Sequence, residues 1–185
     1  MFSLVITALF MSCQEEDELA NLQLLVNSTV EEGGNQPNGW IFVENDGTGL
    51  EFAWTDQEFF SGSKSLQIAN TSDEAEVWGY WAQLYNGDIP YGKDVELSVK
   101  VRGEDLQGQG VSIAVRADRE GQPTNGQFST TQGSTEIKGT FGWTTHKIKL
   151  NSIEPDVYQL YVFLIYTSAT TGEVFFDDAV LSVVE

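Results

Sequence analysis

Short runs in which apolar and polar residues alternate recur along this chain, and their period of two constrains the fold more than any other feature. The clearest run is 94–102, with valine or leucine at each odd position from 95 to 101 and mostly charged residues between them. Successive side chains of a β-strand point to opposite faces, so this run predicts a strand with one buried and one solvated face. Residues 111–116 repeat the pattern, and the intervening Gly103, Gly108 and Gly110 predict a hairpin loop.

Further segments of strand character predict an all-β protein. They lie at 21–27, 40–43, 50–54, 65–68, 77–84, 144–150, 157–166 and 170–183. Both faces of 77–84 and of 157–166 are apolar or aromatic, so each face must be covered or must bind something. Residues 118–139 are polar and non-periodic and predict a long surface loop. Short strands at roughly ten-residue spacing favour a single antiparallel β-sandwich of the jelly-roll type.

The acidic charge balance narrows the choice of partners. The 185 residues include 28 acidic and nine basic side chains, a formal net charge of −19. A protein of this charge is repelled by the phosphates of nucleic acids and by anionic lipid headgroups. We therefore expect no nucleic-acid partner, whereas a divalent cation or a neutral ligand is compatible with this charge.

The first twenty residues have the character of an export signal followed by a tether. An apolar run, too short to span a bilayer, ends at Cys13, the only cysteine. Residues 10–13 resemble the lipobox of bacterial lipoproteins, which implies that residues 1–13 are a signal segment and that Cys13 carries the lipid. Residues 14–20, four of which are acidic, resemble the tether of Bacteroidetes-type surface lipoproteins. This implies an exported outer-membrane lipoprotein that is exposed at the cell surface and contacts the membrane through its anchor alone. The length of the chain predicts a single domain, which would span residues 21–185.

Two adjacent carboxylates, Asp177 and Asp178, interrupt the last apolar strand. Ionised carboxylates are rarely buried unless they are paired or bind a metal. The residues alone leave two interpretations open: a bulge that bends the strand toward solvent, or a metal site.

Several motifs occur in an order that is known from one group of proteins. They lie at 26–33 with Gly39-Trp40, at 62–66, at 81–83, at 97–102, at 139–144 and at 174–178. In this order they resemble the jelly-roll carbohydrate-binding modules and their galactose-binding-like relatives. The resemblance implies a structural Ca²⁺ held by Glu31, by the main chain of the loop at Lys64, and by Asp177 and Asp178. Calcium takes six to eight oxygen ligands, a number that these groups can approach.

Sugar binding requires aromatic rings for stacking and polar groups for the hydroxyls. The candidates for this role are Trp81, Gln83, Arg116, Gln127, Phe128 and Tyr161. For each aromatic residue the alternative is packing in the core, which accounts for most tryptophans in a small all-β domain.

The sequence offers little for catalysis. The single histidine, His146, lies in a predicted strand, where it faces either the core or a ligand, and no Ser-His-Asp set or phosphate-binding glycine loop is present. Residues 73–76 do not match the E-x-D-x-x-E strand of jelly-roll glucanases. We therefore expect no catalytic residues and a non-catalytic carbohydrate-binding lipoprotein. The alternatives are a protein-interaction or structural lipoprotein, and a polysaccharide hydrolase or lyase.

Overall fold

The computed structural model describes residues 22–45, 49–70 and 77–184, and within them it contains nine β-strands and no helix. None of the described segments is a helix that could cross a membrane. All pairings between the strands are antiparallel. The strands are β1 (Ile41–Glu44), β2 (Leu50–Thr55), β3 (Ser65–Asn70), β4 (Gly79–Tyr85), β5 (Asp94–Arg119), β6 (Gln122–Thr130), β7 (Ile137–Leu150), β8 (Val157–Tyr166) and β9 (Thr170–Val184).

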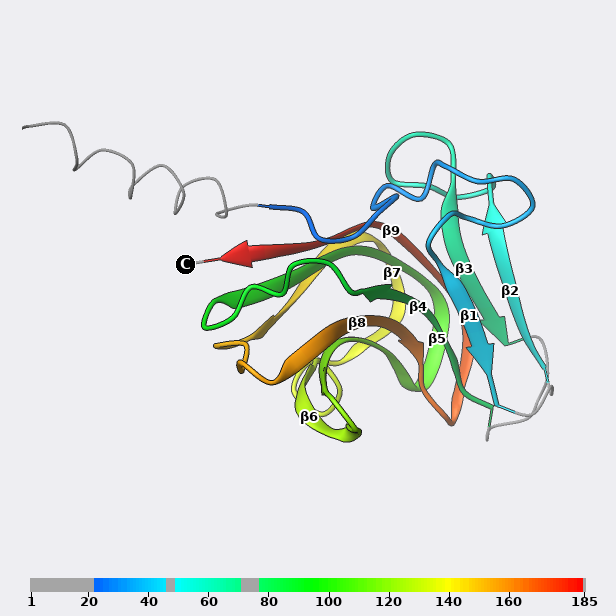
Figure 1. The fold of residues 1–185 in the computed structure, drawn as a ribbon. Helices are drawn as coiled ribbons and strands as arrows, with labels where there is room; N and C mark the ends of the chain where they lie inside the picture. The colour runs from blue at the N-terminus through cyan, green and yellow to red at the C-terminus, as the bar shows by residue number, and fades with distance from the viewer. Residues whose placement is uncertain (1–21, 46–48, 71–76, 185) are drawn as a thin grey trace, which may run out of the picture.

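The long strand β5 joins two layers, as Figure 1 shows. Its first part, 94–108, pairs with β9 on one side and with β7 on the other. Its last part, 111–119, pairs with β8 and β6. We call β1-β4-β8-β5-β6 sheet A and β2-β3-β9-β5-β7 sheet B. The fold is an all-β jelly-roll sandwich, as the strand spacing predicted.

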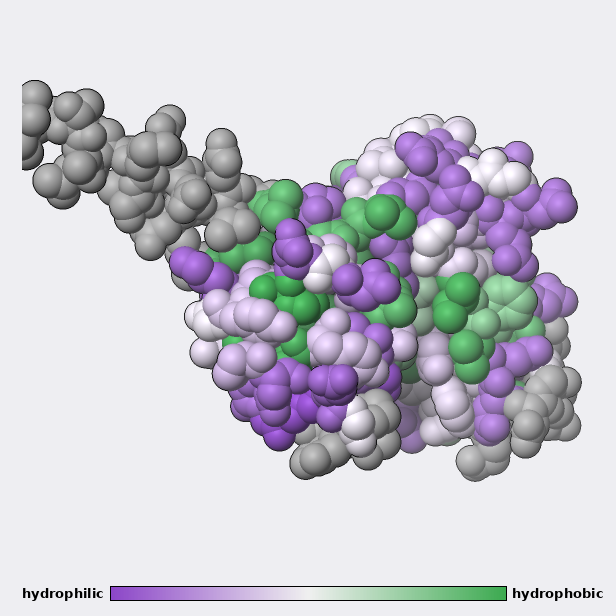
Figure 2. Space-filling model, in the orientation of Figure 1, coloured by the Kyte–Doolittle hydropathy of each residue, from purple (hydrophilic) through white to green (hydrophobic). Residues whose placement is uncertain are grey.

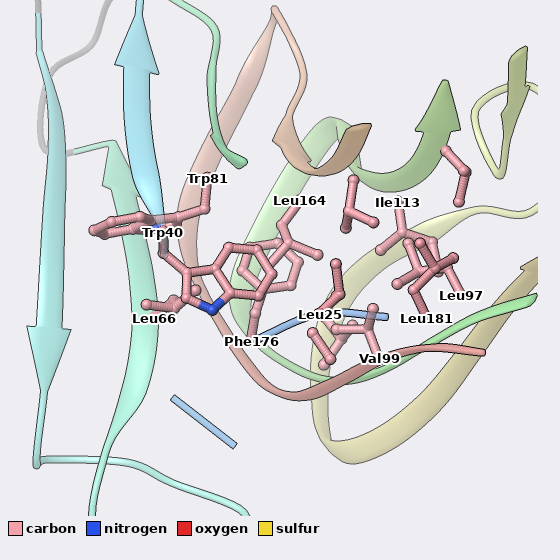
Figure 3. Packing of buried hydrophobic residues seen from close by; sticks show 14 of the residues in the cluster. Leu25, Trp40, Leu66, Trp81, Leu97, Val99, Ile113, Leu164, Phe176 and Leu181 are labelled. Carbon is pink, nitrogen blue, oxygen red and sulfur yellow. The ribbon is translucent and has the colours of Figure 1, made fainter. Parts of the chain in front are cut away.

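The core lies between these sheets because the predicted apolar positions do face inward. The odd-numbered residues 95–101 of β5 in sheet B and 111–117 in sheet A are all buried. Figure 3 shows Leu97 and Phe176 from sheet B close to Ile113 and Leu164 from sheet A. Burying an aliphatic or aromatic side chain of this size contributes about 1.5–3 kcal/mol, so this layer supplies most of the stability of the domain.

The glycines between the two periodic runs do not form the predicted hairpin. The chain continues as β5 through register shifts at 103–111, which are β-bulges that bend the strand from one sheet to the other. At Gly108 the φ angle is +81°, and a Cβ atom there would lie 1.7 Å from the carbonyl oxygen of Ala169. A bend packed this closely requires glycine, so the residues that indicated a turn serve as a crossover.

The predicted loop at 118–139 also proves to be partly a strand. β6 pairs with the end of β5, and a tight turn at Glu120-Gly121 connects them. β6 is polar because it lies at the edge of sheet A, where charged and polar residues are common. Because β6 lacks apolar alternation, the sequence did not predict it as a strand.

The predicted strand at 21–27 is likewise absent from the described part, 22–27. This segment makes one isolated bridge, between Gln23 and Ser182, and side-chain amides hold it in place. The Gln83 side chain accepts a hydrogen bond from the main-chain N–H of Val26 and donates one to its carbonyl. Leu24 and Leu25 are thereby buried beside the core. The signal segment 1–13 with Cys13, the tether 14–20, and residues 46–48 and 73–76 lie outside the described residues.

Candidate functional site

The outward face of sheet A is rich in aromatic side chains and is the candidate site, which we call the aromatic face. Residues opposite one another in an antiparallel pair share a face, so the register defines this surface. One row aligns Val43, Tyr80 and Ile165, and a second aligns Leu84, Tyr161, Arg116 and Phe128. Between them Ala82, Phe163 and Ala114 form a small buried apolar cluster. Figure 2 shows hydrophobic residues reaching the surface in separate patches, one of which lies over β1, where Ile41 and Val43 are exposed.

The rings of this face are arranged against one another. Tyr161 and Phe163 are stacked with centroids 5.8 Å apart, and Tyr80 meets Phe163 edge to face at 5.2 Å. Trp78, just before β4, is stacked on Tyr80 at 6.1 Å. Such ring contacts contribute about 0.5–1.5 kcal/mol each beyond the burial of area, and they fix the ring planes. The face therefore presents a preformed floor of aromatic rings.

A hydrogen-bonded polar group borders this floor. The Arg116 guanidinium lies 4.8 Å from the Tyr161 ring centroid and 5.1 Å from that of Phe163. Its Nε and Nη2 atoms donate to the two oxygens of Asp118 at 2.7 and 3.1 Å. Gln159 donates to Asp118 and contacts the Tyr161 hydroxyl, both at 3.3 Å. These groups place fixed donors and acceptors beside the rings.

The floor is slightly hollowed. A depression of about 230 Å³ is lined by Trp78, Tyr80, Arg116, Phe128, Phe163 and Ile165. Phe128 and Trp78 are 55% and 39% exposed, so their rings are available to a ligand. A shallow depression of this kind suits a flat or extended molecule that lies across the strands.

The structure brings together three of the six predicted ligand-binding residues: Arg116, Phe128 and Tyr161 all belong to the aromatic face. The predicted ligand-binding residues Trp81 and Gln83 do not lie on this face, because both side chains are buried between the sheets. The indole N–H of Trp81 donates to the Gln67 carbonyl, and its ring packs edge-on against Phe42 and Phe52.

Gln127 also points away from the aromatic face. Its amide donates to the carbonyls of Asn151 and Ser152 and accepts from the N–H of Glu154. Among the residues that sequence reasoning missed are Trp78, Tyr80 and Phe163. The alternation in 77–84 did place Trp78 and Tyr80 on the face opposite Trp81, but it gave no sign of which face is outward.

The predicted metal-binding carboxylates converge on the loop between β2 and β3. Both oxygens of Glu31 accept from the N–H of Ser63, and the Lys64 N–H donates to Oε1 at 2.9 Å. Although burial acts in the opposite direction, these hydrogen bonds hold the pKa of Glu31 below its usual value. The Lys64 ammonium group lies 3.8 Å from Asp56 and above the Trp54 ring.

Asp177 and Asp178 hold the same loop from the other side. Asp177 is fully buried, and its Oδ2 accepts from the N–H groups of Phe60 and Ser61 at 2.8 and 3.0 Å. Burial raises the pKa of Asp177 to about 6, and the neighbouring charge of Asp178 acts in the same direction. Asp178 has a φ of 43° and accepts from the Ser61 hydroxyl at 2.8 Å. The pair thus forms a bulge in β9, but one that turns the first carboxylate inward rather than into solvent.

His146 lies on β7 beside Phe141, half-buried. Its Nε2 atom is buried and has no hydrogen-bond partner within the described part of the chain. Burial lowers its pKa, which favours the neutral imidazole. No catalytic partner for it lies among the described residues, in which no group of three histidine, cysteine or acidic side chains is placed to hold a metal ion.

Comparison with known proteins yields similarity at the level of structure. No protein-family profile and no curated protein matches the sequence. A Stig cyclase of Fischerella sp. TAU, solved with an indole compound, has a TM-score of 0.66 at 15% identity and covers 90% of this chain and 100% of its own. The CBM22-1 xylan-binding domain of Paenibacillus barcinonensis has a TM-score of 0.55 at 17% identity, with coverages of 90% and 97%.

A CBM61 module solved with β-1,4-galactotriose has a TM-score of 0.54 at 16% identity and covers 88% of this chain and 99% of its own. The chain also matches a tailspike domain of bacteriophage CBA120, of whose length it spans 21%. At these identities the likeness establishes the fold alone, and that fold is one that carbohydrate-binding modules and cyclases share.

The opposite placements of Trp81 and Phe128 predict opposite consequences of their removal. Trp81→Ala should lower the free energy of unfolding by about 3–5 kcal/mol, since it leaves a large cavity between the sheets. Phe128→Ala should change it by less than about 0.5 kcal/mol, because the ring is mostly in solvent. Urea denaturation of the two variants measures both values. Equal and small losses would contradict the buried position of Trp81.

Proposed function

We propose that this chain is a non-catalytic carbohydrate-binding module that binds a polysaccharide or oligosaccharide on the aromatic face. The observation that carries the proposal is the coexistence on one exposed sheet face of fixed aromatic rings and hydrogen-bonded polar groups. Pyranose rings present C–H groups on one side and hydroxyls at the edge. The aromatic rings of this face can stack on the C–H groups, and its polar groups can hydrogen-bond to the hydroxyls.

The charges of the aromatic face support binding rather than glycoside cleavage. Glycosidases generally use two carboxyl groups that flank the scissile bond. Of the strand residues described on this face, Asp118 is the one carboxylate, and both of its oxygens are held by Arg116. Because it is paired with the guanidinium, Asp118 is poorly placed to act as a catalytic acid, base or nucleophile.

The structural neighbours are consistent with this function. A xylan-binding domain and a module bound to β-1,4-galactotriose share the jelly-roll fold of this chain. The cyclases with the same fold keep an enzymatic function as the second candidate. Release of reducing ends or of unsaturated sugars from a polysaccharide would favour that second candidate.

Binding should depend on Phe128 and not on another exposed phenylalanine elsewhere on the surface. We expect wild-type protein to be retarded in native gels that contain a neutral polysaccharide, such as xylan or galactan, from a panel chosen with a glycan array. Phe128→Ala should weaken retention about fivefold to tenfold, because a stacking contact contributes about 1 kcal/mol. Phe59→Ala, which removes a ring that is 42% exposed and lies in the β2–β3 loop, is the control and should bind like wild type. Equal effects of both changes, or no retention on any polysaccharide, would contradict the proposed function.

We further propose that the module is displayed on the outer membrane through a lipid at Cys13. The support is the apolar run that ends at the only cysteine and the acidic residues that follow it. Expressed with its own leader in a related bacterium, the protein should partition into the membrane fraction and incorporate labelled palmitate, and Cys13→Ala should do neither. Recovery of mature wild-type protein with Met1 intact would contradict this anchor.

A structural Ca²⁺ at the β2–β3 loop is the remaining part of the proposal. Glu31, Asp177 and Asp178 hold one loop, and within the described residues neither aspartate forms an ion pair with lysine or arginine. A buried carboxylate without a cation fits a divalent ion, which would neutralise it. Since the side chains alone do not form a three-ligand cluster, main-chain oxygens of the loop would have to complete the coordination.

Chelation tests the calcium site. Because an ion that binds only the folded state stabilises it, by about 2.7 kcal/mol at a hundredfold excess over Kd, EDTA should lower the melting temperature by several degrees. Asp177→Asn should abolish the calcium response, whereas Asp105→Asn, which removes the charge of an exposed carboxylate at the bend of β5, should keep it. Identical melting temperatures of calcium-loaded and chelated wild-type protein would contradict the calcium site. The carboxylates would then serve only to hold the loop by hydrogen bonds.

A further inference from the structure

The strand residues described on the aromatic face include one cation and one anion, and the two are bound to each other. Arg116 and Asp118 form a bidentate pair with distances of 2.7 and 3.1 Å, the strongest arrangement for these groups. The Asp118 side chain is 1% exposed, whereas that of Arg116 is 37% exposed. A ligand on this face would meet the guanidinium and not the carboxylate.

The carboxylate removes most of the charge that the ligand would meet. Charges of opposite sign in direct contact nearly cancel at the distance of a molecule lying on the rings. Arg116 lines the depression and lies over Tyr161 and Phe163, so its charge is located where a sugar would stack. The remaining N–H groups of the guanidinium can still donate hydrogen bonds to a ligand, but they belong to a pair without net charge.

The rest of the protein does not attract anions either. The chain has a net charge of −19, which opposes the approach of an acidic polymer. Of the strand residues described on the aromatic face, Arg116 alone carries a charge that could offset that repulsion, and Asp118 cancels it.

We propose that Asp118 is a specificity-determining residue that restricts the aromatic face to uncharged glycans by neutralising Arg116. The inference rests on the proposed function and specifies its substrate class as neutral polysaccharides. Asp118 acts through Arg116 and is a positioning residue, since it is buried beneath the guanidinium. Removing its charge leaves an unpaired cation over the Tyr161 and Phe163 rings, where it could pair with the carboxylate of a uronate or the sulfate of a sulfated sugar.

Three proteins test the proposal: wild type, Asp118→Asn, and the double variant Asp118→Asn/Arg116→Gln. Each is run in native gels containing xylan or galactan as neutral probes and polygalacturonate as the acidic probe, at low and high salt. Wild type should be retained by a neutral probe only. Asp118→Asn should gain retention on polygalacturonate by about tenfold, as one added charge-assisted hydrogen bond would give, and should lose that gain at high salt. The double variant should show no gain, because it carries the same asparagine without the cation.

Several outcomes would overturn the proposal. They are a folded Asp118→Asn protein without a gain on the acidic probe, an equal gain in the double variant, and strong retention of wild type on polygalacturonate. Thermal melting reports folding, and Asp118→Ser removes the same charge with a smaller side chain if the asparagine variant does not fold. A purely structural role for Asp118 would weaken retention on every probe and would create no salt-dependent gain. Wild-type retention on a neutral probe without a gain in Asp118→Asn would refute this inference and leave the proposed function intact, whereas no retention of wild type on any probe refutes both.

Discussion

The membership of β5 in both sheets is the constraint on which the rest of this structure depends. One uninterrupted strand supplies inward-facing residues to each layer, so the distance and angle between the layers are set by the bend at 103–111. The same strand supplies an outward surface to each layer. Glu96 and Ser98 face solvent on sheet B, whereas Ala114 and Arg116 lie on the aromatic face of sheet A. A change in the bend would therefore move the core and the candidate site together.

The sequence predicted both a strand and its buried face only where apolar side chains occupy one face of the strand. Residues 94–102 carry apolar side chains on one face only, and the strand and its buried face were both predicted correctly. In 77–84 both faces carry aromatic residues, so the period gave two faces without saying which is inward. The neighbours settle that question: Trp81 meets Phe42 and Phe52 between the sheets, and Tyr80 meets Phe163 on the surface. This information lies in strands distant in sequence, which is why three of the six predicted site residues lie on the aromatic face and the other three do not.

Two sequence predictions were wrong: the hairpin loop expected from the glycines at 103–110, and the loop expected at the polar residues that form β6. Glycine at a positive φ occurs in turns and in bulges alike, so Gly108 and Gly110 could not distinguish a hairpin from a crossover. β6 lacks alternation because an edge strand buries little of either face. For the carboxylates of β9, by contrast, the sequence pointed to a real structural feature. Sequence identified Asp177 as anomalous, and the structure assigns it a fully buried position beneath the β2–β3 loop, where it accepts hydrogen bonds from two main-chain N–H groups of that loop.

The shallowness of the depression on the aromatic face has a consequence for how such a domain would work. A surface that covers one side of a ligand leaves the other side in water, so each contact forms and breaks quickly and a single domain holds a chain only briefly. A polymer with many equivalent segments changes this balance, because release from one copy is followed by capture by the next at a high effective concentration. Retention would then be a collective property of many copies along one polymer, with avidity replacing the tight grip that a deep pocket provides.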